Sequence, residues 1–246
     1  MNIICDNGIL LTLEKYNDRC SKVIIFSKNN GLVQAFLRTP RKSSPHQVYD
    51  FLSFRCRCVD NYNYRDLEIN TIRSYLKSVF ADRLSLSILN SAVSIVNLTL
   101  GGRGTGDNVY RLFQNLVFLT EFRGANLLPH YLDFLLNILE FFGINLNASR
   151  CYVSGLEGDV YYISPVTGNC VSREVGEKYK QKLFVIPKSF GGYSEDLEDL
   201  SAAINIAHHF IYRILFENDM IRGVEIVEMF KKILLKEAEK YYSGNP

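Results

Sequence analysis

Long hydrophobic runs are missing from this sequence of 246 residues. No uncharged apolar stretch reaches the roughly 18 residues that a transmembrane helix needs. The opening residues, Met1 to Asp6, lack the basic segment and the apolar stretch of a secretory signal. We therefore expect a cytoplasmic protein with no membrane partner, whose six cysteines are reduced thiols.

A complete nucleotide-binding or catalytic motif is also missing. The glycine-rich stretch from Gly101 to Asp107 looks like a phosphate-cradling loop, but a P-loop needs Gly-Lys-Ser/Thr after a strand. No lysine follows here and the preceding run has helical periodicity, so an inter-helix linker is the favoured interpretation and phosphate binding the alternative. A cysteine nucleophile needs a base and an orienting group, and neither can be named for Cys151 or Cys170. We predict that the protein is not an enzyme.

Charge is nearly balanced over the whole chain but is uneven along it. The formal net charge is +2, yet residues 1–75 carry 11 Lys and Arg against 7 Asp and Glu. Residues 76–246 carry 17 against 19. This asymmetry suggests that the N-terminal part faces a nucleic acid.

The N-terminal part of the chain has the pattern of a small β-barrel. Five β-prone runs follow one another between residues 3 and 72, and Asn30-Gly31 separates two of them in the manner of a hairpin turn. Five short strands with loops of unequal length suit a barrel of OB type. We predict an OB-type domain over residues 1–75.

The period of the apolar residues then changes to that of helices, and the predicted class is α+β. We expect an all-helical domain over residues 76–246, in which several helices pack on one core. The residues that carry the helical spacing are Ile88, Ala92, Ile95, Val96, Leu132, Leu135, Leu136, Leu139, Ala207, Phe210, Ile211, Ile214, Leu215, Val227, Phe230, Ile233 and Leu234. The tail from Lys236 to Pro246 is predicted to be a fraying helix end.

Residues 151–187 interrupt the helical pattern with a turn-rich insert that has the shape of a zinc ribbon. Cys151 and Cys170 each lie near a turn-forming glycine and flank a β-prone run. A structural zinc needs four nitrogen or sulfur ligands, but Ser154 and Arg173 stand where the partner cysteines would be. We therefore expect a degenerate, zinc-ribbon-like insert that binds no metal, with Cys151 and Cys170 as weak candidate ligands.

The four histidines are not expected to serve as metal ligands in the insert. His46, His130, His208 and His209 all lie far from the two cysteines in sequence, and His208-His209 fall within an apolar helix pattern. We interpret them as satisfied core or surface residues. The protein is accordingly expected to have no cofactor.

One predicted strand, Val48 to Val59, combines cations with aromatic rings. Alternation places Leu52, Phe54, Cys56 and Cys58 on an apolar face. Cations can contact the phosphates of a single-stranded nucleic acid while aromatic rings stack on its bases. The DNA-binding candidates are Tyr49, Phe51, Arg55 and Arg57 on the opposite face, with Arg38, Arg41 and Lys42 from the preceding loop. The alternative is an ordinary solvated strand face.

Taken together, the motifs resemble those of the bacterial RecO family of recombination mediators. The similar segments are Asp6-x-Gly8-Ile9-Leu10-Leu11, Ile24-Ile25-Phe26-Ser27-x-x-x-Gly31-Leu32-Val33, Phe141-Phe142-Gly143-Ile144-x-Leu146 and Tyr179 to Pro187, around the insert itself. Members of that family differ in whether they keep the zinc cysteines. The glycine cluster at 101–106 and the modestly charged basic loop depart from its pattern.

The resemblance implies a mediator of DNA repair and homologous recombination in the bacterial DNA damage response. Such proteins bind single- and double-stranded DNA, anneal complementary strands and, with RecR, help to load RecA. They also engage the acidic C-terminal tail of single-strand-binding protein, for which Phe122 and Arg123 are the candidates here. The implied localisation is cytoplasmic and nucleoid-associated. The alternative is a non-enzymatic scaffold whose barrel binds a protein partner and not DNA.

Overall fold

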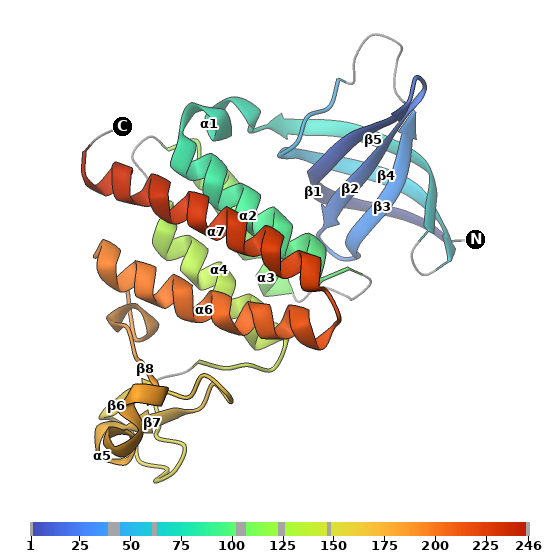
Figure 1. Ribbon diagram of the computed structural model, residues 1–246. Coiled ribbons are helices and arrows are strands. Elements are labelled where there is room, and N and C mark those ends of the chain that lie inside the picture. Colours follow the sequence, from blue (N-terminus) through green and yellow to red (C-terminus); the bar gives the residue numbers. More distant parts are fainter. Residues whose placement is uncertain are drawn as a thin grey trace. The chain divides into compact units, whose positions relative to one another are not determined.

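The computed structural model describes residues 2–38, 45–60, 63–101, 107–122, 126–146 and 149–244. The chain divides into two compact units, Met1–Ala125 and Asn126–Pro246 (Figure 1). The expected domain boundary at residue 75 lies inside the first unit, at the point where the strands give way to helices. Five strands followed by helices confirm the α+β class.

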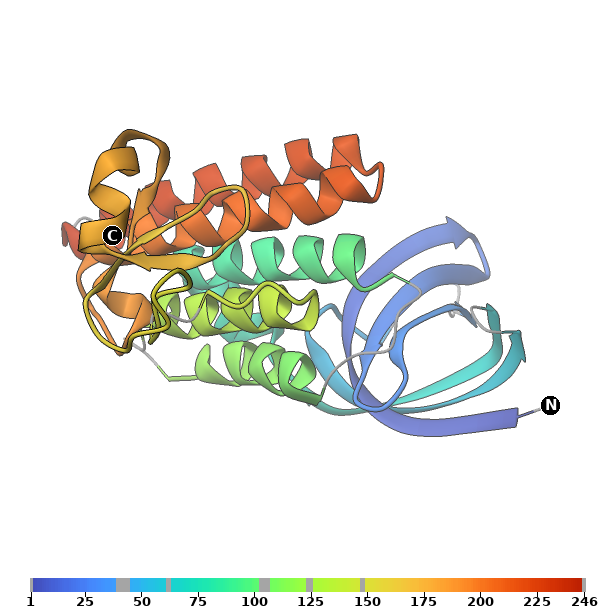
Figure 2. The same ribbon diagram turned by 90° about the horizontal axis from the view of Figure 1, so that it is seen from below.

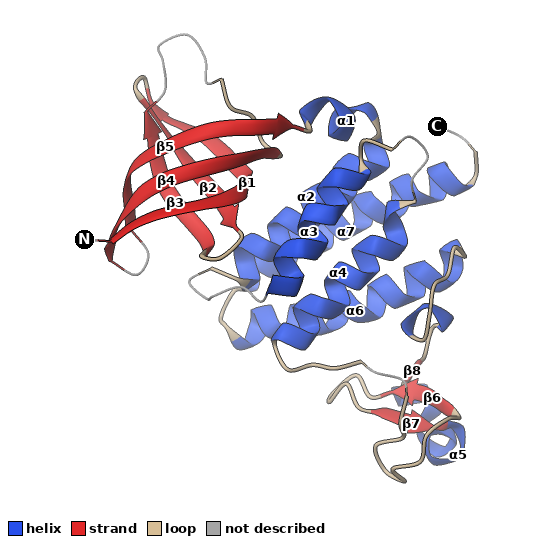
Figure 3. Ribbon diagram, turned by 180° about the vertical axis from the view of Figure 1, so that it is seen from behind, coloured by secondary structure: helices blue, strands red, loops and turns tan. Residues whose placement is uncertain are grey.

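The strands of the first unit curl round on themselves (Figure 3). They are β1 (Asn2–Asn17), β2 (Cys20–Ser27), β3 (Gly31–Arg38), β4 (Asp50–Asp60) and β5 (Asn63–Ser74). β1 pairs antiparallel with both β2 and β4, and β4 pairs antiparallel with β5. One parallel pair, Ala35 with Tyr64, joins β3 to β5, so the pairings close a barrel in the order β1-β2-β3-β5-β4.

Alternation along these strands builds the barrel core. In β3 every second residue is buried, because successive side chains point to opposite faces. The buried set is Leu10, Val23, Ile25, Val33, Ala35, Leu37, Leu52, Phe54, Cys56 and Leu67. The β4 face that was predicted to be apolar thus supplies three core residues.

The hairpin predicted from Asn30-Gly31 is confirmed, and two residues of β1 fix its position. Gly31 adopts a φ of 69°, in the left-handed region that glycine enters without strain. The Asp6 carboxylate accepts hydrogen bonds from the Asn29 backbone N–H (2.8 Å) and from side chains of the turn. A Cβ on Gly8 would come within 2.5 Å of Ile25 Cγ2, so only glycine fits where β1 crosses β2.

Three helices complete the first unit: α1 (Leu76–Ala81), α2 (Arg83–Thr99) and α3 (Asp107–Leu119). The Asp82 carboxylate caps α2 by accepting the backbone N–H of Ser85 at 2.7 Å. Phe26 of β2 packs edge-on against Tyr110 and Phe113 of α3, with ring centroids 5.2 and 5.5 Å away. The glycine cluster lies between α2 and α3, and residues 102–106 fall outside the described residues.

The second unit is built on α4 (Leu127–Phe141), α6 (Leu197–Glu217) and α7 (Ile221–Tyr242). α6 packs against both α4 and α7, and α6 and α7 run side by side (Figure 2). The predicted helical periodicity is confirmed in each. The part of the predicted tail up to Tyr242 is helical and packed and not frayed: it belongs to α7, Ala238 is fully buried, and the Asn126 side chain donates to the Tyr242 hydroxyl.

The insert is a three-stranded sheet with short helices around it. Its elements are β6 (Val160–Ile163), β7 (Cys170–Ser172), α5 (Arg173–Gly176), the 3-10 helix η1 (Glu177–Lys182), β8 (Phe184–Val185) and the 3-10 helix η2 (Lys188–Phe190). The strand order is β7-β6-β8. A Cβ on Gly176 would lie 2.3 Å from the Tyr162 ring, which explains the glycine there.

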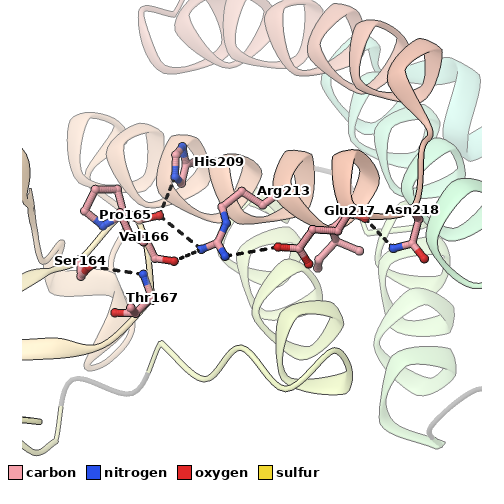
Figure 4. Close-up of polar contacts among 9 residues, drawn as sticks. Ser164, Pro165, Val166, Thr167, His209, Arg213, Glu217 and Asn218 are labelled. Atoms are coloured by element: carbon pink, nitrogen blue, oxygen red, sulfur yellow. Dashed lines mark hydrogen bonds and ion pairs between the residues drawn. The ribbon is translucent and has the colours of Figure 1, made fainter.

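Two side chains of α6 hold the turn between β6 and β7 (Figure 4). His209 Nε2 lies 3.0 Å from the Pro165 carbonyl oxygen, and the Arg213 guanidinium donates to the carbonyl of Val166. Gly168, with φ of 76°, brings the same turn close to Leu146 and Phe210. The insert is therefore anchored to the helices of its own unit.

Among the described residues, no helix combines the length and the apolar content needed to cross a membrane.

Candidate nucleic-acid interface

The outer face of β4 carries three of the predicted DNA-binding residues. Phe51 is half-buried, while Arg55 and Arg57 are exposed. Arg57 Nη2 lies 2.9 Å from the Asp66 carboxylate, so part of its charge is already neutralised. Arg55 is left as the better candidate to meet a phosphate.

Arg55 lies in a surface hollow of about 710 Å³ between β1, β4 and β5. Its neighbours across the two strand pairs are the exposed Cys5 of β1 and Glu68 of β5. Asn7, Ser53 and Asn70 also line the hollow. The mixture of amide, hydroxyl and charged groups suits a polar, hydrated contact with a backbone, but Glu68 offsets the charge of Arg55.

The expectation that Tyr49 stacks on bases is wrong. Tyr49 is only 3% exposed, and its hydroxyl donates to Asn90 Oδ1 at 2.8 Å. The residue has a φ of 66° and precedes β4, which begins at Asp50 and not at Val48. The alternation that placed Tyr49 beside Phe51 therefore does not reach it. Burial raises the pKa of its phenol above the usual range.

Of the remaining candidates, the structure describes Arg38 and Phe122. Arg38 is exposed at the end of β3. Arg41, Lys42 and Arg123 lie outside the described residues. Phe122, proposed for the tail of single-strand-binding protein, is 54% exposed and packs edge-on against Phe118 with ring centroids 5.2 Å apart.

A second exposed face, on β1, β2 and β3, was missed from the sequence. Tyr16 and Phe36 are 67% and 50% exposed, and their rings meet edge-on with centroids 5.0 Å apart. Lys22 lies opposite Phe36 in the β2–β3 register. Arg38, two residues after Phe36, points to the same side. We call Tyr16, Lys22, Phe36 and Arg38 the aromatic face.

Part of the aromatic face could have been found from the sequence. The predicted strand from Leu32 to Leu37 already alternates, so Phe36 could have been placed on its outer side. Tyr16 could not, because the apolar run of β1 ends at Leu13 while the strand continues to Asn17. Exposed aromatic rings in contact on a sheet surface are a common sign of a binding surface.

The insert cysteines are both buried but differ in character. Cys151 Sγ accepts the Ser172 backbone N–H at 3.3 Å. Hydrogen bonding from the Ser154 hydroxyl, followed by the Ser154 backbone N–H, lowers the pKa of the Cys151 thiol to about 6. Burial raises the pKa of Cys170 to about 11. Ser154, which stands where a partner cysteine would be, thus acts as a donor to the remaining sulfur.

These donors do not fit a structural zinc. Tetrahedral zinc needs four nitrogen or sulfur ligands. Within the described parts of the chain, no group of three or more His, Cys, Asp or Glu side chains is placed to hold a metal. Hydrogen bonds to Cys151 Sγ connect it to Ser154 and Ser172 of the insert.

Comparison with known proteins identifies the family. The family model described as "Recombination protein O C terminal" matches residues 81–211, more than half of the chain. The "DNA repair protein RecO" of Rickettsia canadensis is 27% identical over 239 residues, covering 94% of this chain and 96% of that protein. The protein of the same name from Rickettsia bellii is 28% identical over 241 residues, covering 95% and 97%. The one from Anaplasma phagocytophilum is 28% identical over 225 residues, covering 87% and 90%. The chain belongs to the RecO family.

Proposed function

We propose that this protein is a mediator of DNA repair and homologous recombination that binds single- and double-stranded DNA and anneals complementary strands. Membership of the RecO family and the names of its relatives support the biological setting. The closed order of the five strands supports an OB-type barrel as the DNA-binding part. Annealing needs no catalytic residue, because a protein that screens phosphates lowers the barrier to strand pairing.

The observation that carries the proposal is the aromatic face. Tyr16 and Phe36 offer exposed rings on which bases stack, and stacking suits any sequence because every base has a π-face. Lys22 and Arg38 lie beside the rings, where they can meet the phosphates that connect stacked bases. Phe51, Arg55 and Arg57 on β4 would extend the contact along a strand.

The partners follow from the same family membership. We propose that RecR acts with the protein and that RecA is loaded as the result, in a cytoplasmic, nucleoid-associated setting. We propose further that Phe122 and Arg123 receive the C-terminal tail of single-strand-binding protein, with Arg41 and Lys42 adding charge to the DNA surface. On this proposal the protein is not an enzyme, and its insert works without a metal.

A decisive test is the fluorescence anisotropy of a labelled single-stranded oligonucleotide titrated with the Phe36→Ala variant. Loss of one stacked base is expected to weaken binding by about 1–3 kcal/mol, or roughly fivefold to more than a hundredfold. Lys22→Ala is expected to lower the dependence of log affinity on log salt by about 0.7. Tyr152→Ala is the matched control, because Tyr152 is 71% exposed but lies in the insert.

Two results would reject the aromatic face as a DNA site. One is equal affinity of the Phe36→Ala and Tyr152→Ala variants for DNA. The other is the absence of any salt-sensitive binding by the unaltered protein, which would favour a scaffold whose barrel binds a protein partner.

A further inference from the structure

The second unit contains a cavity of about 310 Å³ between α4, residues 188–195, which we call the η2 loop, and the start of α6. Four residues of α4 form one wall: Pro129, Leu132, Asp133 and Leu136. The rings of Phe190 and Tyr193 line the cavity from the η2 loop. None of the proposed DNA-binding residues lines this cavity.

Asp133 is the one charged residue in the α4 wall. Residues 129, 132, 133 and 136 follow helical spacing and so share a face, which is otherwise apolar. Within the part of the chain that the structure describes, the Asp133 carboxylate makes no hydrogen bond or ion pair. Partial burial raises its pKa, with a smaller opposing effect from His130 one turn earlier. Asp133 is nonetheless an exposed residue, so its carboxylate is open to a cation that arrives from solvent.

Hydrogen bonds to two carboxylates hold the loop that carries the two rings in place. The Asp199 carboxylate accepts the backbone N–H groups of Lys188 at 2.6 Å and Ser189 at 2.9 Å. The Tyr193 hydroxyl donates to Glu195 at 2.8 Å. The loop is therefore fixed at its start and near its end, which keeps the rings at the cavity before any ligand arrives.

We propose that this cavity binds an arginine side chain presented by a protein partner. A guanidinium is planar and can lie against an aromatic ring while two of its N–H groups meet the Asp133 carboxylate. The leucines of α4 suit the apolar stem of the same side chain. A lysine ammonium keeps its water more strongly and cannot make the paired contact.

Charge also decides which partner fits. Asp133 is the one charged residue among the described residues that line the cavity, and it gives the site a negative character. An acidic tail would meet repulsion here, so the site is distinct from the tail-binding site proposed at Phe122 and Arg123. The occupant is a basic segment of a partner, and the inference does not depend on DNA binding.

The inference can be tested on the full chain labelled with 3-fluorotyrosine. The Tyr193 resonance is assigned by its disappearance in Tyr193→Phe, and N-acetyl-arginine amide is then titrated. We expect a saturable shift of that resonance, with a dissociation constant in the millimolar range that suits a single side chain. The matching citrulline compound has the same shape without the charge and should cause no shift.

Two variants separate the carboxylate from general charge effects. Asp133→Asn is expected to weaken binding about fivefold, while Glu140→Gln, an exposed change on the same helix, should leave it unchanged. The proposal fails if citrulline binds as well as arginine, if Asp133→Asn binds normally, or if no saturable shift appears by roughly 50 mM. It also fails if an acidic peptide with a free C-terminal carboxylate gives the same saturable shift.

Discussion

His208 is a buried side chain that should make the folding stability of the protein depend on pH. It is fully buried in α6, and its Nε2 lies 2.9 Å from the Tyr131 hydroxyl. Burial, aided by the nearby Lys231 and opposed by Glu228, lowers its pKa from 6.5 to about 3. The helix pattern predicts a satisfied core or surface histidine. The structure places His208 in the core, where Nε2 meets Tyr131 but the buried Nδ1 has no hydrogen-bond partner among the described residues.

The folded protein is expected to lose stability in acid because of His208. Above pH 6.5 the ring is neutral in both states; below it, the unfolded chain takes up a proton that the folded chain refuses until about pH 3. This histidine alone should cost up to about 1.4 kcal/mol of unfolding free energy for each pH unit in that window. Urea denaturation between about pH 7 and pH 5 measures the slope.

The substitution that isolates this effect is His208→Gln, which keeps a polar partner for Tyr131 but cannot titrate. Its slope should be shallower than that of the unaltered protein. His209→Gln serves as control, because His209 is only partly buried and contacts the Pro165 carbonyl. Parallel slopes for the unaltered protein and His208→Gln would contradict the assignment.

At the scale of elements, the β2–β3 turn depends on a carboxylate from a different strand. Asp6 accepts hydrogen bonds from Ser27, Asn29 and Asn30. Partial burial opposes the charge, but the hydrogen bonds outweigh it and lower the pKa of Asp6. The turn is thus fixed to β1 as well as by its own sequence.

Asp6→Ala is expected to lower the free energy of unfolding by about 1–2 kcal/mol, since it removes a charged acceptor shared by several donors. Asp18→Ala, which removes only the exposed pair with Lys15, should have no measurable effect. The contribution of Asp6 should be present above its ordinary pKa of 3.8 and disappear as the pH falls through its lower folded value. Chemical denaturation of both variants checks this, and equal stabilities would refute the role of Asp6.

The elements were easier to predict than their ends. The Asn-Gly turn and the helical spacing are local signals, so the hairpin and the helices α2, α4, α6 and α7 could be predicted. The end of β1 could not, because Tyr16 belongs to a strand that pairing with β2 extends beyond its apolar run. The prediction for Tyr49 was wrong for a related reason. Tyr49 itself adopts the left-handed conformation just before β4, so the alternation of the strand ends there.

At the scale of the whole molecule, the net charge of +2 is too small to hold DNA by itself. On the proposed function, affinity for DNA must come from local groups, and these are not equivalent. Arg55→Ala is expected to reduce the salt dependence of single-strand binding by about 0.7 in log–log slope. Arg57→Ala should reduce it less, because Asp66 already compensates Arg57.

Anisotropy titrations at several salt concentrations distinguish these two variants. The double variant should weaken binding and flatten the slope further than either single change. An unchanged slope in the double variant would remove β4 from the DNA surface and leave the aromatic face on β1, β2 and β3.

Sites assembled from distant segments were beyond prediction. The α4 residues that line the cavity have an ordinary helical spacing, and only the fold brings Tyr193 of the η2 loop beside Asp133. Likewise, Ser154 in place of a cysteine indicated that a zinc ligand is missing from the insert. The sequence did not indicate that the Ser154 hydroxyl donates to Cys151. Sequence spacing reports which residues share an element, whereas packing decides which elements share a site.

The position of Cys5 has a practical consequence. All six cysteines are described and none is in a disulfide; Cys5 is exposed, three others are buried and two are intermediate. Cys5 lies opposite Arg55 in the β1–β4 register. Cys151 has the lower pKa but is only 1% exposed, so a thiol-reactive fluorophore should attach to Cys5 first, without engineering. Its emission should then report when a ligand covers the outer surface of β4.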